Sequence, residues 1–227
     1  MIANLPERLQ LARASGGSAA TAYWLASRLL RIETYKFCAT RLPAGDVELD
    51  MSLPTGYAYL CIDSKEAMER CDPNVLATLD RNNGVSVADT VAGGGRIYAI
   101  TRGNQAVTQQ RVEFGKGYTA SPYPMDLFIG DREAFFSFLY TFPAERGKGL
   151  ARRLTAHIMN RLANEGISRC ISHTRATNIG SLATRFRCGW RLVALAYSFK
   201  PRKRGFIRHL PAWREVGCTL RAVRIRS

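Results

Sequence analysis

Two glycines in a basic stretch join an apolar run to a helical pattern, and this junction constrains the fold more than any other part of the chain. The apolar run covers residues 134–140, Gly147 and Gly149 follow it, and the helical pattern begins at Leu150. This order predicts a strand, a tight turn and a helix start. Glycines let the backbone turn sharply and come close to a ligand, while the free amides and the dipole of a helix start attract an anion. Positive charges gather at the same point on Lys148, Arg152 and Arg153, so we predict a phosphate-binding loop.

The sequence around this loop mixes strand and helix patterns. Two β-type runs, 96–102 and 106–114, are joined by Gly103-Asn104-Gln105, which is a good hairpin signal because Gly and Asn tolerate positive φ. Further along, strands and helices are expected to alternate at 133–141, 150–165, 167–174, 178–187 and 192–199. This pattern predicts an α/β (α+β) fold with a central mixed, mostly antiparallel sheet, a locally parallel pair around the central helix, and flanking helices.

The N-terminal half is less regular. Small and polar residues near 14–18 suggest a joint after an N-terminal helical extension, residues 1–31. The main domain is expected over 32–199 and a basic C-terminal segment of the same domain over 200–227. Within the domain we expect strands at 32–42 and 57–62, helices at 64–70 and 74–80, a loop of undefined form at 82–95, and a long connection at 115–130 that could cover a substrate.

The chain is strongly basic. Its 33 Lys and Arg against 18 acids give a net charge of +15 and a pI near 10.1, and nine of the basic residues follow residue 199, where Glu215 is the one acid. Such a balance predicts attraction to polyanions: phosphorylated small molecules, an acidic carrier protein, an anionic membrane or nucleic acid, the last not favoured. A basic surface that is simply solvated is the competing interpretation.

The six cysteines form no C-x-x-C pair and have no histidine at metal-ligand spacing. Reduced thiols in a cytoplasmic protein are therefore expected, and no metal site. No apolar run approaches the roughly 18 to 20 residues that span a bilayer, and the first residues do not resemble a signal peptide. We expect a cytoplasmic location, with attachment to the inner face of the membrane as an alternative.

The central residues resemble the GCN5-related N-acetyltransferase (GNAT) superfamily. Its pyrophosphate-binding signature, Q/R-x-x-G-x-G/A, is matched by Arg146-Gly147-Lys148-Gly149-Leu150-Ala151. Asn178-Ile179-Gly180-Ser181, ending in Cys188-Gly189-Trp190, is similar to the family's N-x-x-A/S run leading to a G-F pair. The resemblance covers residues 95–200 well and the first 90 residues poorly.

The resemblance implies an acyl-CoA-dependent acyltransferase, most simply one that moves the acetyl group of acetyl-CoA directly to an amine. The pyrophosphate would be held by backbone amides of the loop 146–151, with Arg146 and Lys148 beside them. The pantetheine arm would lie along the splayed strand end at Tyr140 and Thr141, with Asn178 and Ser181 on its far side. A strand amide near Leu139 or Tyr140 would polarise the thioester carbonyl.

The acid and the base are less defined by the pattern. Glu133 and His173 are the candidates for the base that takes a proton from the acceptor ammonium. Alternatively, Glu133 is a solvated charge at a strand end and His173 a hydrogen-bonded neighbour of the sheet. Many family members place a tyrosine seven residues after the Asn to protonate the leaving thiolate, and here Arg185 stands at that position. Tyr140, Tyr197, water or positive charge would then have to take over that role.

Two other interpretations stay open at this point. The first is an acyltransferase of the same fold that takes its acyl group from acyl carrier protein, with the phenylalanines at 135–142 lining an acyl tunnel instead of the core. The second is a GNAT-like module without catalysis that binds nucleic acid or membrane through its basic surface. The identity of the acceptor does not follow from the sequence.

Overall fold

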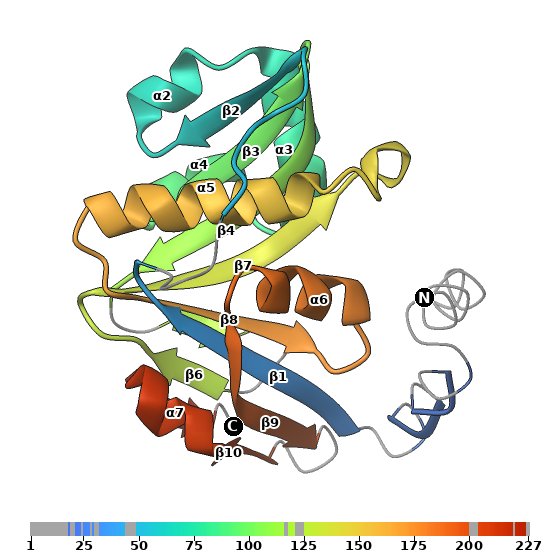
Figure 1. Cartoon of the computed structure of the whole chain (residues 1–227), viewed down its shortest axis with the longest axis vertical. Helices are drawn as coiled ribbons and strands as arrows, with labels where there is room; N and C mark the ends of the chain where they lie inside the picture. The colour runs from blue at the N-terminus through green and yellow to red at the C-terminus, as the bar shows by residue number, and fades with distance from the viewer. Residues whose placement is uncertain are drawn as a thin grey trace.

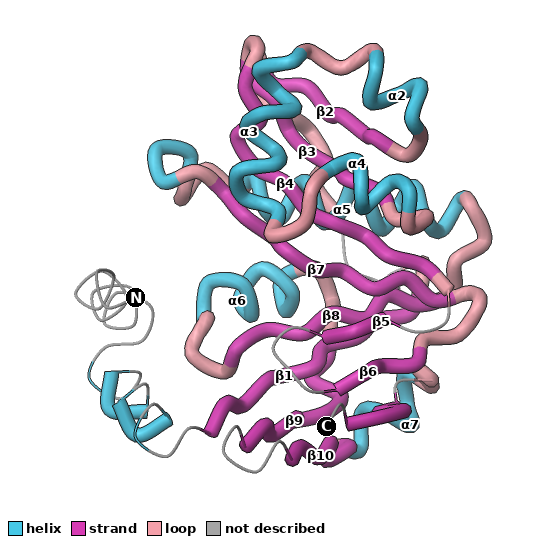
Figure 2. The backbone as a smooth tube through the Cα atoms, turned by 180° about the vertical axis from the view of Figure 1, so that it is seen from behind, coloured by secondary structure: helices cyan, strands magenta, loops and turns pink. Residues whose placement is uncertain are grey.

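A computed structural model describes residues 32–43, 49–115, 118–120, 125–199, 204–219 and 221–225, together with the helical positions 18, 21–23, 25–27 and 29. The predicted N-terminal extension 1–31 lies mostly outside the described residues. The chain forms a large twisted sheet with helices on both faces and a small second sheet beside it (Figures 1 and 2). The predicted α/β class is confirmed.

The main sheet has eight strands in the order β10-β9-β1-β8-β7-β4-β3-β2. Its neighbours pair antiparallel except β7 and β8, which are parallel, as predicted. Because a parallel pair needs a crossover, the 15-residue helix α5 (Leu150–Asn164) connects these two strands. The strands are β1 (Ile32–Arg41), β2 (Tyr57–Ile62), β3 (Arg96–Arg102), β4 (Gln105–Phe114), β7 (Glu133–Thr141), β8 (Arg169–Arg175), β9 (Arg191–Phe199) and β10 (Arg204–His209).

Side-chain alternation along β3 divides the molecule into two layers. Tyr98 and Ile100 pack in the core beneath α5, whereas Ile97 and Ala99 pack in a second core beneath α3 (Pro73–Asn83) and α4 (Val87–Ala92). Since successive strand residues point to opposite faces, α5 lies on one face and α3 with α4 on the other. Figure 1 looks onto the α5 face, where α6 (Ile179–Arg187) also lies, and Figure 2 onto the reverse.

The N-terminal strand β1 is inserted in the middle of the sheet. It pairs with β8 on one side and β9 on the other, so Phe37 faces His173 in one register and Ala194 in the other. A short helix α7 (Pro211–Val216) packs near β1 and β9, where Val216 and Cys218 join the core of Tyr35 and Phe37. The strand that the sequence placed at 32–42 therefore brings its side chains beside those of the central strands.

Several connections are more ordered than predicted. The undefined loop at 82–95 contains α4, whose N-cap Ser86 accepts a hydrogen bond from the amide of Asp89 at 2.9 Å and whose Val87 and Thr90 are buried. The long connection at 115–130 contains strands β5 (Tyr118–Ala120) and β6 (Met125–Phe128), and its role as a cover of the substrate remains a prediction. These strands form a three-stranded sheet with β11 (Arg221–Ile225).

The basic C-terminal segment is built into the fold. β10 extends the main sheet beyond β9, and β11 pairs with β6 in the small sheet. The division of the chain into an extension, a domain and a basic segment remains a prediction.

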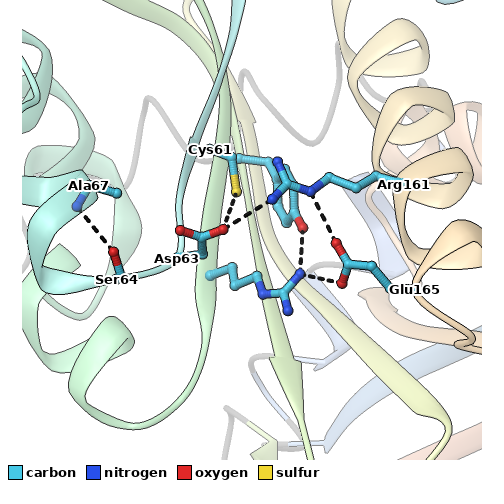
Figure 3. Close-up of polar contacts among 8 residues, drawn as sticks. Cys61, Asp63, Ser64, Ala67, Arg161 and Glu165 are labelled. Atoms are coloured by element: carbon cyan, nitrogen blue, oxygen red, sulfur yellow. Dashed lines mark hydrogen bonds and ion pairs between the residues drawn. The ribbon is translucent and has the colours of Figure 1, made fainter.

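The helix α2 (Lys65–Glu69) begins directly after Ser64, the predicted capping residue. The hydroxyl of Ser64 accepts from the amide of Ala67 at 3.1 Å (Figure 3).

Charged side chains hold the C-terminal end of α5 to strands β2 and β3. The guanidinium of Arg161 bonds to Asp63 at 3.0 Å and to Glu165 at 3.1 Å (Figure 3). Arg96 of β3 bonds to the second oxygen of Glu165 at 2.5 Å. This network fixes the far end of the helix whose N-terminus forms the predicted phosphate loop.

Candidate functional site

The parallel strands β7 and β8 separate at the end where the site was predicted. Their pairing runs from Glu133 and Arg169 to Phe136 and Ser172, and stops there although both strands continue. The opening lies next to the start of α6 and the turn before α5. A slot between two strands leaves backbone amides and carbonyls free to bond to a ligand instead of to each other.

A β-bulge in β7 lies at the opening. Gln109 pairs with Tyr140 and Arg111 with Ser137, so one residue of β4 faces the two residues Phe138 and Leu139. Phe138 has φ = 51°, a left-handed conformation that is strained for a side chain of this size. Bulges re-aim the backbone beside active sites, and this one interrupts the ladder where a strand amide was expected to polarise a carbonyl.

Neighbouring side chains hold the bulge. The guanidinium of Arg111 lies 4.2 Å from the centre of the Phe138 ring, and its Nε donates to the Ser137 hydroxyl at 3.0 Å. The side-chain amide of Gln110 donates to the carbonyl of Ser137. Because Gln110 and Arg111 are almost fully buried, the strained conformation is fixed from the β4 side.

The loop after β7 presents a row of free backbone amides. A single 3₁₀ turn, Pro143–Glu145, follows the strand, and Gly147 and Gly149 then adopt φ = 81° and 75°. Within the described part of the chain, the amides at 147–151 donate to no protein acceptor, and α5 begins without a side-chain cap. Free amides at the start of a long helix form an anion site, so the loop has the geometry that a pyrophosphate needs.

The positive side chains beside the loop are held in place. Lys148 bonds to the carboxylate of Glu145 at 2.8 Å, and the same carboxylate accepts from the hydroxyl of Tyr57 at 2.7 Å and from Arg102 at 3.2 Å. The hydrogen bonds from Lys148 and Tyr57 lower the pKa of Glu145. The hydrogen bond to Glu145 in turn raises the pKa of Lys148. Both groups are thus charged at neutral pH.

Two more arginines are oriented by contacts around the loop. Arg146 donates from Nε to the carbonyl of Thr141 at 3.0 Å. Arg153 bonds to Asp50 at 3.0 Å and to the carbonyl of Lys148 at 2.9 Å. These contacts leave the loop basic while tying its cations to defined positions.

A cavity of about 240 Å³ lies at the opening between β7 and β8. It reaches from the start of α6, where Asn178 caps the helix by accepting from the amide of Ser181 at 3.1 Å, to the side chains of β1. Its wall consists of Tyr35, Ser137, Phe138, Leu139, His173, Thr174, Arg175, Asn178 and Ser181. The structure therefore brings together four of the predicted site residues, Leu139, His173, Asn178 and Ser181.

Tyr140 and Thr141 lie between this cavity and the loop. The carbonyl of Tyr140 accepts from the hydroxyl of Thr108 at 2.9 Å, and its ring packs on Phe142 with 5.2 Å between centroids. Tyr140 does not line the cavity, so its phenol is poorly placed to protonate a group there. Its position fits backbone contact with a ligand better than acid catalysis.

Glu133 lies at the other end of β7. Thr141 stands eight positions further along the strand, which corresponds to roughly 25 Å in extended form. Its buried carboxylate accepts from the amide of Gly130 at 2.8 Å, from the amide of Thr219 at 2.9 Å and from the Thr219 hydroxyl. This group ties the C-terminal segment to the turn before β7 and does not line the cavity, so it is poorly placed for the predicted role of base.

Sequence reasoning missed Tyr35 and Arg175, which also line the cavity. The Tyr35 hydroxyl donates to Glu33, and burial, with this hydrogen bond, raises the pKa of Tyr35. The His173 ring packs against Tyr35 and Phe37 at centroid distances of 5.6 and 5.7 Å. The strand at 32–42 was predicted, but no local signal places it beside β8.

A comparison with protein families identifies this part of the chain. Residues 89–190 match the family model described as Acetyltransferase (GNAT) family, a range that contains the bulge, the loop, α5, β8 and α6. Over this range the chain therefore matches an acetyltransferase domain of the GNAT family. A comparison with curated proteins finds no match.

Solved structures similar to this chain include GNAT proteins of low sequence identity. A GNAT-family protein from Novosphingobium aromaticivorans is 17% identical, with a TM-score of 0.47, over 74% of this chain and 63% of that one. A GCN5-related N-acetyltransferase from Sphaerobacter thermophilus is 13% identical, with a TM-score of 0.49, over 80% of this chain and 55% of that one. The chain thus spans somewhat less than two thirds of either structure.

The remaining observations concern the thiols, possible metal ligands and the length of the helices. All six cysteines are free thiols. Among the described residues, no group of three or more His, Cys, Asp or Glu is arranged to hold a metal ion. Within the same ranges, no helix combines the length and the apolar character that crossing a bilayer requires.

Proposed function

We propose that this protein transfers an acetyl group from acetyl-CoA directly to an amine. The observation that carries the proposal is the alignment of three features: free amides at 147–151, an open strand pair, and a cavity at the bulge. The pyrophosphate of the donor would bind the amides, with Arg146 and Lys148 beside it. The pantetheine arm would then run past Tyr140 and Thr141 towards the cavity.

The reaction would take place at the cavity wall. The bulge frees the backbone near Leu139 and Tyr140, so an amide there can donate to the thioester oxygen as negative charge develops on it. The acceptor nitrogen attacks the carbonyl carbon, and the C–S bond breaks as the C–N bond forms. Asn178 and Ser181 lie at the α6 side of the cavity and would contact the end of the pantetheine arm.

The base proposed for the acceptor ammonium is His173. It lies on the cavity wall, whereas Glu133 lies at the far end of β7. Tyr35, hydrogen-bonded to Glu33, faces the same space and could pass a proton through water. A proton acceptor within reach of the attacking nitrogen typically contributes about 10²-fold to 10⁴-fold.

The two alternatives fit the site less well. Phe135 and Phe136 are fully buried in the cores on the two faces of the sheet, and of the phenylalanines at 135–142 only Phe138 lines the cavity. One ring on the wall gives little support to an acyl tunnel for a carrier-protein substrate. A binding module without catalysis has no use for a strained bulge beside a cavity.

Binding and turnover together test the proposal. Acetyl-CoA should raise the melting temperature of the protein, whereas acetate should not. A panel of amines should then release free thiol, with the acetylated product identified by mass. Indifference to every CoA ester would contradict the assignment of the loop, and binding without thiol release for any amine would favour the non-catalytic module.

A further inference from the structure

Arg185 is a fully buried cation beside the cavity. It lies on α6, its side chain is 1% exposed, and it is the largest of the fully buried side chains in the described part of the chain. Desolvation lowers its pKa to about 10, so the guanidinium remains charged at neutral pH. No carboxylate among the described residues pairs with it, and its Nε has no hydrogen-bond partner there.

The groups around Arg185 are neutral. Its guanidinium donates to the Gln110 side chain at 2.7 Å and to the Thr155 hydroxyl at 3.3 Å. It also lies over the rings of Trp190 and Phe136, at 4.7 and 5.2 Å from their centres. These contacts satisfy some of the hydrogen-bond donors of the guanidinium but do not balance its charge.

Three thiols are the titratable groups that interact electrostatically with Arg185. They come from β1, β8 and the end of α6, and burial raises the pKa of each: Cys38 to about 11, and Cys170 and Cys188 also upward. None of them is a thiolate at neutral pH. Burying an unbalanced charge costs several kcal/mol, so a resident cation of this kind suggests an anion that is present only during the reaction.

The charge lies directly behind the cavity wall. Gln110 links the guanidinium to the carbonyl of Ser137, which lines the cavity. Two hydrogen bonds of about 3 Å and one amide group put the guanidinium within roughly 8 Å of that wall. Ser181, also on the wall, is four residues before Arg185 and so lies on the same face of α6.

We propose that Arg185 stabilises the thiolate of coenzyme A that is released into the cavity. This inference rests on the proposed acetyl transfer. When the C–S bond breaks, its electron pair stays on sulfur, while the proton of the acceptor nitrogen goes to the base or to water. A fixed cation in a poorly solvated region lowers the free energy of the departing thiolate without having to give up a proton.

With a fixed cation at this position, the departing thiolate does not need a proton donor. Arg185 occupies the position where the resembling family often has a tyrosine, but its head group points into the core and does not line the cavity. It is therefore a positioning and electrostatic residue instead of a contacting acid. At an effective dielectric constant near 20, a unit charge at this range shifts the pKa of a thiol by about one unit.

Binding of coenzyme A and acetyl-CoA at different pH values tests the inference, because only the first has an ionisable thiol. We expect the affinity for coenzyme A, relative to acetyl-CoA, to rise about 10-fold as the pH rises from about 7 to about 9.5 in the wild type. His173, Tyr35 and Arg175 also face the cavity, but they contact the part that the two ligands share, so their contribution cancels in the ratio of the affinities. In Arg185→Met the rise should disappear, and in Arg185→Lys, which keeps the charge, most of it should remain.

The outcomes separate the two proposals. If both ligands bind and the affinity ratio of the wild type is independent of pH, or rises equally in Arg185→Met, the role of Arg185 is wrong while the acetyl transfer stands. If neither ligand binds, both proposals are wrong. Cooperative thermal unfolding confirms that each variant is folded, and Arg185→Gln replaces the Met variant if that one does not fold. The wild-type curve alone already decides whether the thiolate is bound preferentially.

Discussion

The ammonium of Lys148 lies 2.8 Å from the carboxylate of Glu145, three residues before it in the same loop. Glu145 in turn accepts from Tyr57 of β2 at 2.7 Å. The loop is thus fastened to the edge of the sheet on one side, while its amides stay free on the other. Such preorganisation matters for anion binding, because the donors need no rearrangement when the ligand arrives.

Replacing Gly147 by Asp should abolish donor binding. Gly147 has φ = 81°, and a Cβ added there would have no atom within 4 Å, so the substitution adds negative charge at the amide row without a steric clash. We expect at least about a 100-fold loss of acetyl-CoA affinity, measured by calorimetry. Gly166→Asp is the matched control, since Gly166 has φ = 83° and equally open surroundings at the other end of α5. Equal losses in both variants would mean that backbone strain, and not the anion site, is responsible.

Replacing His173 by Gln should lower kcat about 100-fold with little change in acetyl-CoA affinity, because the cavity keeps its shape but loses the proposed base. Tyr140→Phe is the control from the predicted catalytic set, and it should leave kcat within about 3-fold, since Tyr140 does not line the cavity. Steady-state kinetics and calorimetry on both variants check this. A larger loss for Tyr140→Phe than for His173→Gln would reverse the assignment.

Replacing Glu133 by Gln should affect stability and not catalysis. The buried carboxylate accepts from two amides and a hydroxyl, and an amide can accept with only one oxygen. We expect a loss of about 2 kcal/mol in the free energy of unfolding, measured by urea denaturation, with kcat unchanged in the folded variant. A fall of kcat without loss of stability would restore Glu133 as a catalytic candidate.

These residues show where sequence reasoning reaches its limit. The loop, α5, β8 and α6 follow from local signals: glycines, caps and hydrophobic periodicity. Glu133 has the right chemistry and stands on the right strand, but only the register of β7 places it far from the opening. Tyr35 is separated from His173 by more than 130 residues in sequence and becomes its neighbour because β1 is inserted beside β8. Pairing between distant strands depends on global packing, which no short pattern encodes.

Stability should depend on pH through the network at the end of α5. Burial opposes ionisation of Glu165, but the hydrogen bonds from Arg96 and Arg161 dominate and lower its pKa. A lowered folded pKa gives stability that is complete above the unfolded value and is lost as the pH falls through the folded value. Glu165→Gln should therefore cost about 1 kcal/mol near neutral pH, after solvent screening, and much less at a pH of about 3.

Urea denaturation at both pH values checks this prediction. Glu69→Gln is the control, because Glu69 makes an exposed pair with Lys65 at 3.6 Å, and it should change stability little at either pH. A cost for Glu165→Gln that is the same in acid and at neutral pH would show that packing, and not charge, holds this end of the helix.

Replacing Gly84 by Ala should disturb the bulge without touching the donor loop. A Cβ at Gly84 would lie 2.5 Å from Cε1 of Phe138, so the ring that lines the cavity has to move. Gly94→Ala is the matched control, because Gly94 has φ = 75° against 71° for Gly84 and open surroundings. Both variants carry similar backbone strain, of about 1 kcal/mol.

We expect kcat to fall about 10-fold in Gly84→Ala alone, with acetyl-CoA affinity kept in both variants, since the amides at 147–151 are unaffected. The reason is that the ring of Phe138 has to leave its place at the bulge, whose backbone carries the amide proposed to polarise the thioester. Steady-state kinetics on the two variants then measure how much the strained position of Phe138 contributes to the reaction. Equal kcat values in Gly84→Ala and Gly94→Ala would remove the bulge side chain from the site.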